Sequence, residues 1–185
     1  IYAPLYLIYL FIYYFIEIEF IIFIVKNDVI VVFFYYHKYC MYKEKYPLKS
    51  VCLLRLSSLG DITHMIPIVN TIKNENPKIN ITWIINKTEY ELVKNIKNVT
   101  FIVVDKTNLI EAMKKLYKLR SSITFDVLLH MQVSLRSNIF SMLIKSKRKI
   151  GYNKCLSKNL HSLLGHEEID CEEKIHVLDT FFCFL

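Results

Sequence analysis

The chain predicts an α/β fold, in which a Rossmann-like parallel sheet is flanked by helices. Along residues 41–185, short runs of apolar residues alternate with segments whose apolar residues recur at helical spacing. Strands and helices in such alternation form βαβ units, which have parallel strands and right-handed crossovers. A sharp change in composition near residue 40 separates this part from the residues before it.

The predicted elements follow one another in order. Ser50–Leu56 is an apolar run with one Arg, and its length suits a buried strand. After residues 57–61 the spacing becomes helical until Asn76-Pro77, which ends the helix. The same reasoning predicts strands at Ile79–Ile85, Phe101–Val104, Phe125–Met131 and Lys149–Tyr152, and helices at Glu89–Ile96, Leu109–Leu119, Leu135–Ile144 and Lys174–Phe184.

Residues 1–40 differ in composition from the rest. Of these residues, 32 are apolar or aromatic, and the run Ile1–Ile16 holds no charge. A spanning helix needs about 20 apolar residues, so this run is borderline. The first Met is Met41, and the segment lacks a basic n-region and an A-x-A cleavage site. Three interpretations stay open: translation upstream of the true start, a membrane anchor, or a buried extension. We expect residues 1–40 to lie outside the fold and residues 41–185 to form it.

Residues 41–185 are basic, with 22 Lys and Arg against 14 Asp and Glu, which favours anionic partners. Val127–His166 contains no acidic residue and holds Arg136, Lys145, Lys147, Arg148, Lys149, Lys154 and Lys158. This span is either a solvated face or a contact for a phosphorylated lipid. Arg136 is then the preferred contact, because Arg binds such groups in a bidentate manner. The chain has no nucleic-acid recognition motif, so no nucleic-acid partner is expected.

Five scattered cysteines, without C-x-x-C or metal spacing, indicate reduced thiols and no metal site. Cys52 and Cys183 fall in predicted elements and are expected to be core residues.

The turn after the first predicted strand carries the main candidate site. It offers Ser57, Ser58, Gly60 and Asp61 at the carboxyl end of a strand, where open α/β sheets bind ligands. Gly60 would let the backbone turn sharply. The alternative is that Ser58 or Asp61 only caps the following helix. The turn has neither G-x-G-x-x-G nor G-x-x-x-x-G-K-[ST], and the chain has no D-x-D, so a nucleotide or metal-chelating site is not supported here.

These residues resemble the opening of glycosyltransferase family 9, the ADP-heptose:lipopolysaccharide heptosyltransferases. Leu54–Pro67 is similar to that family's pattern R-x-S-[SA]-x-G-D-[VI]-x-H-x-x-P. Further segments match family motifs in the same order: Ile81–Ile85, Phe125–Gln132, Arg148–Tyr152 and His176–Asp179. The family more often has Asp where this chain has His130. The resemblance covers Val51–Leu185.

The resemblance implies the N-terminal, acceptor-side half of a two-domain GT-B enzyme that inverts the sugar's configuration. Asp61 stands at the position of the family's catalytic base, which takes a proton from the acceptor hydroxyl. The residues expected to contact the acceptor are Ser57, Ser58, Gly60, His64, Gln132 and Arg136. ADP-heptose would bind mainly in a C-terminal domain, so no cofactor is expected in this chain, which alone would be inactive.

The implied partners are a lipopolysaccharide core precursor, which is an anionic glycolipid, and the cytoplasmic surface of the inner membrane. The protein would be cytoplasmic and peripheral to that membrane. Two other classes stay open: a basic α/β binding module without catalytic activity, and a small membrane protein built around Ile1–Cys40.

Overall fold

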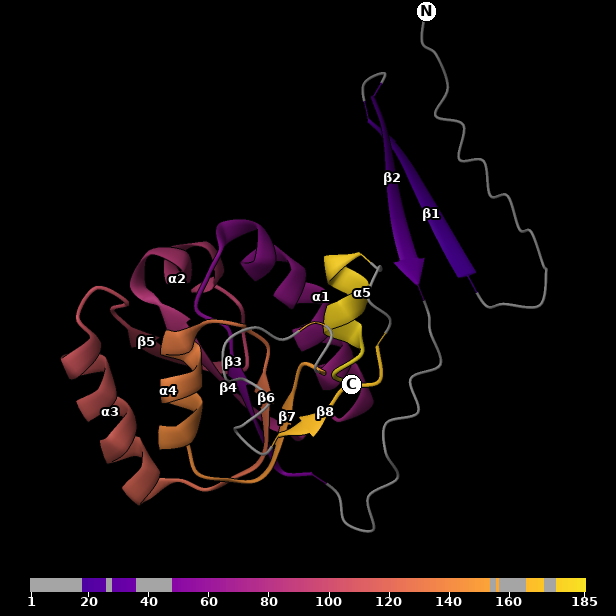
Figure 1. Cartoon of the computed structure of the whole chain (residues 1–185). Coiled ribbons are helices and arrows are strands. Elements are labelled where there is room, and N and C mark those ends of the chain that lie inside the picture. Colours follow the sequence, from indigo (N-terminus) through magenta and orange to yellow (C-terminus); the bar gives the residue numbers. More distant parts are fainter. Residues whose placement is uncertain (1–17, 26–27, 36–47, 154–155, 157–165, 172–175) are drawn as a thin grey trace, which may run out of the picture. The chain divides into compact units, whose positions relative to one another are not determined.

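The computed structural model describes residues 18–25, 28–35, 48–153, 156, 166–171 and 176–185 (Figure 1). The chain divides into two units, Ile1–Lys43 and Glu44–Leu185, close to the change in composition. In the first unit, β1 (Ile18–Val25) pairs with β2 (Asp28–Tyr35) as an antiparallel hairpin. Within the described ranges, no helix is long and apolar enough to cross a bilayer. The run Ile1–Ile16 and Met41 lie outside those ranges.

The second unit is built on a six-stranded sheet with the order β5-β4-β3-β6-β7-β8. Every neighbouring pair of strands is parallel. The strands are β3 (Ser50–Leu54), β4 (Asn80–Asn86), β5 (Val99–Val104), β6 (Phe125–His130), β7 (Ser146–Gly151) and β8 (Glu167–Glu168). The chain starts in the middle, builds outward to β5, and then returns to the other side of β3. This is the strand order of a Rossmann fold, with its switch point between β3 and β6. The predicted fold class is confirmed.

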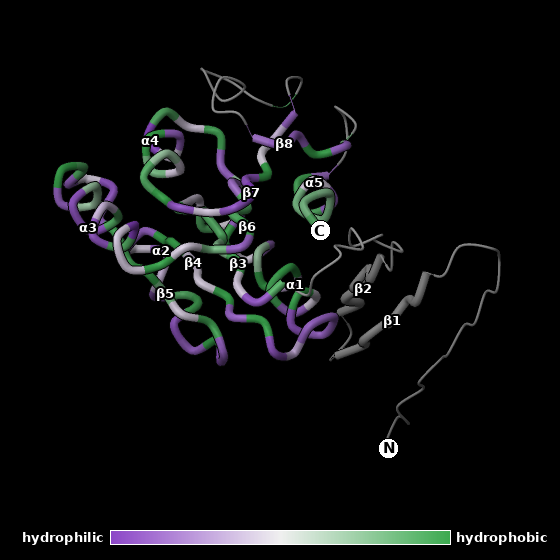
Figure 2. Tube along the Cα trace, turned by 90° about the horizontal axis from the view of Figure 1, so that it is seen from below, coloured by the Kyte–Doolittle hydropathy of each residue, from purple (hydrophilic) through white to green (hydrophobic). Residues whose placement is uncertain are grey.

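Helices cover both faces of the sheet (Figures 1 and 2). They are α1 (Leu59–Glu75), α2 (Lys87–Val93), α3 (Leu109–Ser122), α4 (Leu135–Leu143) and α5 (Val177–Phe182). Successive side chains of a strand point to opposite faces, and β3 shows the result. Val51 and Leu53 join one core with residues of α1 and α5. Cys52 and Leu54 join the other core with residues of α3 and α4.

Of the two cysteines that were expected in the core, one is fully buried. Cys52 is a buried core residue with a free thiol, as predicted. Cys183 is only partly buried, and its Sγ lies 2.9 Å from Sγ of Cys171. Cys40 and Cys155 lie outside the described residues.

Candidate active site

A cleft of about 510 Å³ opens beyond the carboxyl ends of β3 and β6. These two strands flank the switch point of the sheet, which is where ligands bind in open α/β folds. The loops after β3, β6 and β7, the first turn of α1 and the helix α5 form its lining. The lining residues are Arg55, Ser57, Ser58, Asp61, Gln132, Val133, Tyr152, Leu156, Val177, Thr180 and Phe181.

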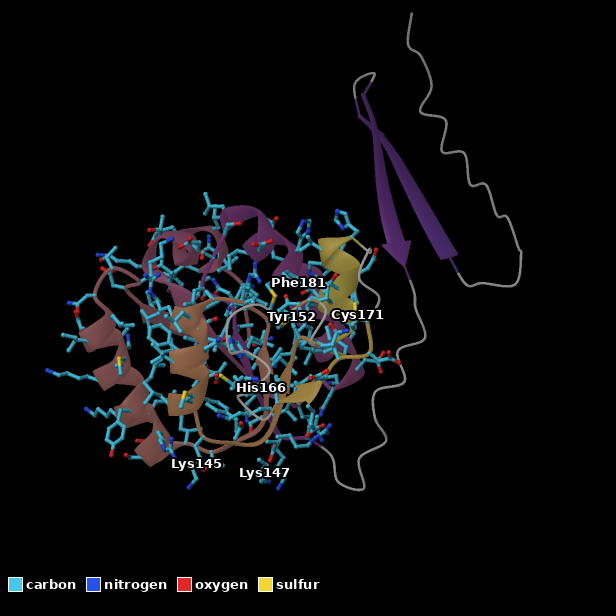
Figure 3. All side chains as sticks on the ribbon, in the orientation of Figure 1. Lys145, Lys147, Tyr152, His166, Cys171 and Phe181 are labelled. Atoms are coloured by element: carbon cyan, nitrogen blue, oxygen red, sulfur yellow. The ribbon has the colours of Figure 1, made fainter. Side chains whose placement is uncertain are left out.

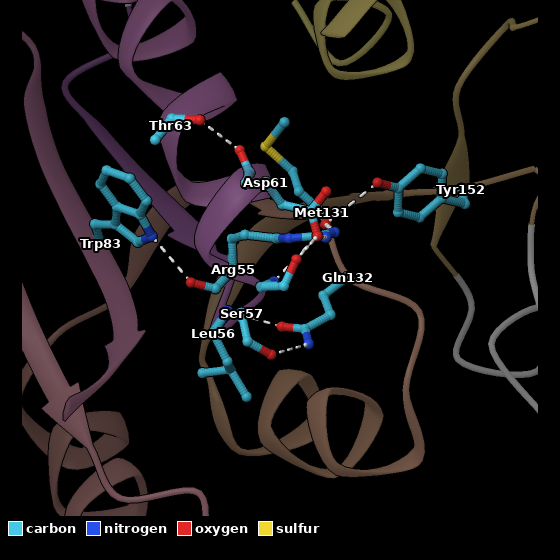
Figure 4. Close-up of polar contacts among 11 residues, drawn as sticks. Arg55, Leu56, Ser57, Asp61, Thr63, Trp83, Met131, Gln132 and Tyr152 are labelled. Atoms are coloured by element: carbon cyan, nitrogen blue, oxygen red, sulfur yellow. Dashed lines mark hydrogen bonds and ion pairs between the residues drawn. The ribbon is translucent and has the colours of Figure 1, made fainter. Parts of the chain in front are cut away.

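Arg55 and Asp61 form an ion pair in this cleft (Figure 4). Nη2 of Arg55 donates a hydrogen bond to Oδ2 of Asp61, and Nη1 donates to the carbonyl oxygen of Met131. The ring of Phe181, from α5, lies 5.0 Å from the guanidinium carbon. The guanidinium group therefore ties together the turn after β3, the loop after β6 and α5.

Ser58 supplies two more hydrogen bonds to the same carboxylate oxygen. Its backbone N–H and its hydroxyl each donate to Oδ2 of Asp61 at 3.0 Å. Ser58 precedes α1 as its N-cap, and Asp61 is the third residue of that helix. Among the residues that the structure describes, none donates a hydrogen bond to Oδ1 of Asp61. The hydrogen-bonding capacity of this second oxygen is therefore not used by a described residue, although Asp61 lines the cleft.

The Asp61 carboxyl group is ionised at neutral pH. Partial burial raises its pKa, but the hydrogen bonds from Ser58 and the positive charge of Arg55 outweigh burial. The net pKa lies below the ordinary value of an Asp side chain. An ionised carboxylate at the mouth of a sheet can accept a proton from a hydroxyl that comes within hydrogen-bond reach.

Gln132 holds the turn between β3 and α1 in place (Figure 4). Its Oε1 accepts the N–H of Leu56 at 2.7 Å, and its Nε2 donates to the hydroxyl of Ser57 at 3.3 Å. On the other side, the indole N–H of Trp83 donates to the carbonyl oxygen of Arg55 at 3.1 Å. Because neighbouring strands fix both sides of the turn, the position of the cleft is set by the sheet.

Tyr152 lies beside this network, after β7. Its hydroxyl donates to the carbonyl oxygen of Met131 at 3.2 Å, and its ring packs edge-on against Phe184. Burial raises the pKa of Tyr152 to about 12, so the hydroxyl stays protonated and remains a hydrogen-bond donor at neutral pH.

The structure brings four of the predicted site residues together: Ser57, Ser58, Asp61 and Gln132 all line the cleft. Gly60 does not line it, and the reason given for this glycine is wrong. Gly60 is the second residue of α1, and a Cβ atom there would meet nothing within 4 Å. The turn therefore does not require a glycine at this position.

Neither His64 nor His130 is among the described residues that line the cleft. His64 packs its ring edge-on against His176 at 5.6 Å. His130 is fully buried, with its ring 5.0 Å from that of His166. Its place at the end of β6 therefore puts it in the interior of the domain.

The basic span, Val127–His166, carries less unpaired positive charge than its sequence indicates. Lys147 pairs with Asp126 at 2.7 Å, and Arg148 pairs with Glu167 at 2.6 Å. These two acidic residues stand just outside the span in the sequence, so the count of acids within it misses them. Among the described cations of the span, Arg136, Lys145 and Lys147 are exposed. Arg136 lies in the first turn of α4 and is not among the described residues that line the cleft. Lys154 and Lys158 lie outside the described residues.

Sequence reasoning missed Arg55, Tyr152 and the contribution of α5. The available signal was Arg55 itself, a lone charge at the end of a buried apolar strand. Such a group needs a partner, because an unpaired charge is costly to bury. Tyr152 and Phe181 carry no comparable signal, since an aromatic residue beside a strand or in a helix usually belongs to the core.

Fold and cleft together define a Rossmann-like domain whose ligand site presents an ionised carboxylate. No family model matches the chain. It is 38% identical over 136 residues to the lipopolysaccharide core heptosyltransferase OpsX of Haemophilus influenzae, a match that covers 74% of this chain and 39% of the relative. The chain is thus a relative of the heptosyltransferases and spans about two fifths of the length of this one.

Solved structures agree at the level of the fold. The heptosyltransferase WaaC of E. coli, solved with ADP-2-deoxy-2-fluoro heptose, superposes with a TM-score of 0.64 at 18% identity, over 73% of this chain and 47% of that one. A glycosyl transferase of family 9 from Veillonella parvula gives a TM-score of 0.58 at 17% identity, over 74% of this chain and 40% of that one. The resemblance to glycosyltransferase family 9 that the motifs indicated agrees with the sequence relation to OpsX, and the solved structures support the fold.

Proposed function

We propose that the chain forms the acceptor-side half of an inverting heptosyltransferase, which transfers heptose from ADP-heptose to the inner core of lipopolysaccharide. The observation that carries the proposal is the carboxylate of Asp61. It lies ionised in the cleft at the switch point, with Oδ2 held by Arg55 and Ser58 and with no described donor on Oδ1. The sequence relation to a lipopolysaccharide core heptosyltransferase supports this choice of sugar and acceptor.

In this mechanism Asp61 acts as the general base. Its Oδ1 accepts the proton of an acceptor hydroxyl while that hydroxyl oxygen forms a bond to the anomeric carbon of the heptose. The bond from that carbon to the ADP oxygen breaks on the opposite face, so the configuration inverts. Arg55 and Ser58 keep the carboxylate ionised and oriented. The donor nucleotide would be bound by residues beyond this domain, since the chain has no phosphate-binding fingerprint.

The acceptor would be an anionic glycolipid, and the enzyme would work in the cytoplasm at the surface of the inner membrane. A basic binding module without catalytic activity is the weaker candidate. Two cations of the basic span are neutralised by Asp126 and Glu167, while the cleft presents a carboxylate. A cleft of that kind suits a hydroxyl better than it suits a polyanion.

A chimera tests the proposal. The 136 residues that match the Haemophilus influenzae relative replace the corresponding segment of that enzyme, and the product is assayed with ADP-heptose and a core acceptor that lacks heptose. We expect transfer of heptose with release of ADP. Absence of transfer by a folded chimera, measured beside the active parent enzyme, would contradict the proposal.

A further inference from the structure

Helices α3 and α4 each carry two large apolar side chains that are exposed, with the same spacing in both helices. Ile110 and Tyr117 of α3 are 69% and 63% exposed, and Leu135 and Met142 of α4 are each 57% exposed. In both helices the two residues are seven positions apart, which is close to two helical turns. Each pair therefore lies on one side of its helix, away from the core.

The two helices form one layer on the same face of the sheet (Figures 1 and 2). Their inner sides share a core that includes Ala112, Leu116 and Phe140. Nη1 of Arg120 in α3 donates to the carbonyl oxygen of Met142 in α4 at 3.0 Å, which joins them directly. Their outer sides are thus one continuous surface, called here the α3–α4 surface.

This surface is also strongly basic. Within the two helices, Glu111 is the one acidic residue beside five cations: Lys114, Lys115, Lys118, Arg120 and Arg136. Lys114 and Lys118 are exposed and lie within one turn of Tyr117 along α3. Exposed Lys145 follows α4 (Figure 3). Apolar side chains interleaved with Lys and Arg are typical of helices that lie in the interface of a membrane.

We propose that the α3–α4 surface docks on an anionic lipid bilayer, with its apolar side chains among the lipids and its cations at the phosphate groups. The charge pattern favours a bilayer as the occupant. Apolar groups flanked by like charges would face repulsion in a self-association, whereas Lys side chains can extend to a layer of lipid phosphates. This inference deepens the proposed function and rests on it for the membrane's role as the source of acceptor.

The position of the surface suits that role. Ile110 and Leu135 stand at the N-terminal ends of α3 and α4. These helices follow β5 and β6, so their N-terminal ends lie at the carboxyl edge of the sheet, where the cleft opens. Docking here would bring the head group of a lipid acceptor toward Asp61 while the sheet stays outside the bilayer.

A single-site fluorophore tests the inference on the full chain. Trp83 is the chain's one Trp and is fully buried, so a second Trp reports its own surroundings. With vesicles rich in phosphatidylglycerol, Tyr117→Trp should shift its emission to shorter wavelength and be quenched by brominated lipid. The matched control is Leu92→Trp on α2, which replaces a side chain of similar exposure, 56%, and should show neither effect.

Charge is tested separately by vesicle sedimentation. Replacing both Lys114 and Lys118 by Gln should lower the partition coefficient about fivefold for each charge removed. Replacing Lys78 and Lys87, which are exposed elsewhere, should change it little.

Three results would overturn the inference: no quenching of Tyr117→Trp, equal quenching of Leu92→Trp, or a dimer in sedimentation velocity that Leu135→Ser abolishes. The last result would assign the surface to a second copy of the chain. None of these measurements uses donor or acceptor, so their failure is separate from a failure of heptose transfer, which can be assayed with detergent-dispersed acceptor.

Discussion

Asp61 lines the cleft and uses only one of its carboxylate oxygens for hydrogen bonds to described residues. Oδ2 receives hydrogen bonds from Ser58 and Arg55, which fix the start of α1. The two interpretations of Asp61 from sequence, a capping residue and a base, are therefore compatible. At the helix start, Ser58 is the N-cap and Asp61 accepts its backbone N–H, as in a capping box.

Arg55 can be tested as the residue that holds Asp61. Arg55→Ala removes the positive charge and the hydrogen bonds to Asp61 and Met131, so we expect a loss of about 1–3 kcal/mol of unfolding free energy. The pKa of Asp61 should rise, because a nearby cation favours the ionised form. Arg55→Lys keeps the positive charge, so the pKa of Asp61 should return close to its value in the unmodified chain. The unfolding free energy should recover less, since Lys lacks the planar pair of donors. Urea denaturation and NMR titration of the Asp61 carboxyl group measure both, and an unchanged Asp61 titration in Arg55→Ala would contradict this role.

Single residues also show where sequence reasoning ended. Sequence patterns predicted Ser57, Ser58 and Asp61 as site residues because they follow a buried strand. Gln132 was predicted for the same reason, since it follows a second buried strand. Arg55 was quoted in the motif but given no role, because its partners, Asp61 and the Met131 carbonyl, meet only when β3 and β6 pair. The interior position of His130 was equally hidden, since its ring packs against that of His166, which is distant in the sequence.

At the scale of elements, the strands and helices predicted between residues 48 and 153 are all present, with ends shifted by a few residues. Apolar periodicity carried these predictions. It failed for β8, a two-residue strand made of Glu167 and Glu168, which has no apolar character. The hairpin of β1 and β2 was also missed, because a continuous apolar run does not distinguish strands from a spanning segment.

Asp126 joins three strands and gives a pH-dependent prediction. Its carboxylate accepts hydrogen bonds from Lys147, from the backbone N–H groups of Lys49 and Ser50 and from the Ser50 hydroxyl, at the start of β3, β6 and β7. The bond from Lys147 is the largest cause of a pKa lowered to about 2. A lowered pKa stabilises the fold at pH values above the ordinary Asp pKa, and this stabilisation is lost as pH falls toward 2.

We therefore expect Asp126→Asn to cost on the order of 1 kcal/mol at pH 7, after allowance for solvent screening. The difference in unfolding free energy from the unmodified chain should shrink between about pH 4 and pH 2, as the native carboxylate takes up its proton. Chemical denaturation across this range measures it. A difference that is constant down to pH 2 would mean that the charge of Asp126 does not stabilise the sheet.

At the scale of the whole molecule, the chain consists of two units that divide after Lys43. The second unit holds both apolar cores and the cleft. Deleting Ile1–Cys40 should therefore leave its melting temperature unchanged and raise its solubility, because the deleted segment is 32/40 apolar. Differential scanning calorimetry of the full and shortened chains tests this. A much lower melting temperature for residues 41–185 would show that the segment belongs to the fold.

Turnover of Asp61→Asn in the active chimera shows whether Asp61 is the general base. Asn keeps the size of the side chain and an oxygen for the Ser58 N–H, but it cannot take a proton and it loses the ion pair with Arg55. Asp126→Asn is the matched control, since it removes another ion-paired aspartate that lies outside the cleft lining. We expect kcat to fall about 10²–10⁴-fold in Asp61→Asn, with donor binding retained, and to stay near normal in the control. Near-normal turnover by a folded Asp61→Asn enzyme would contradict this role.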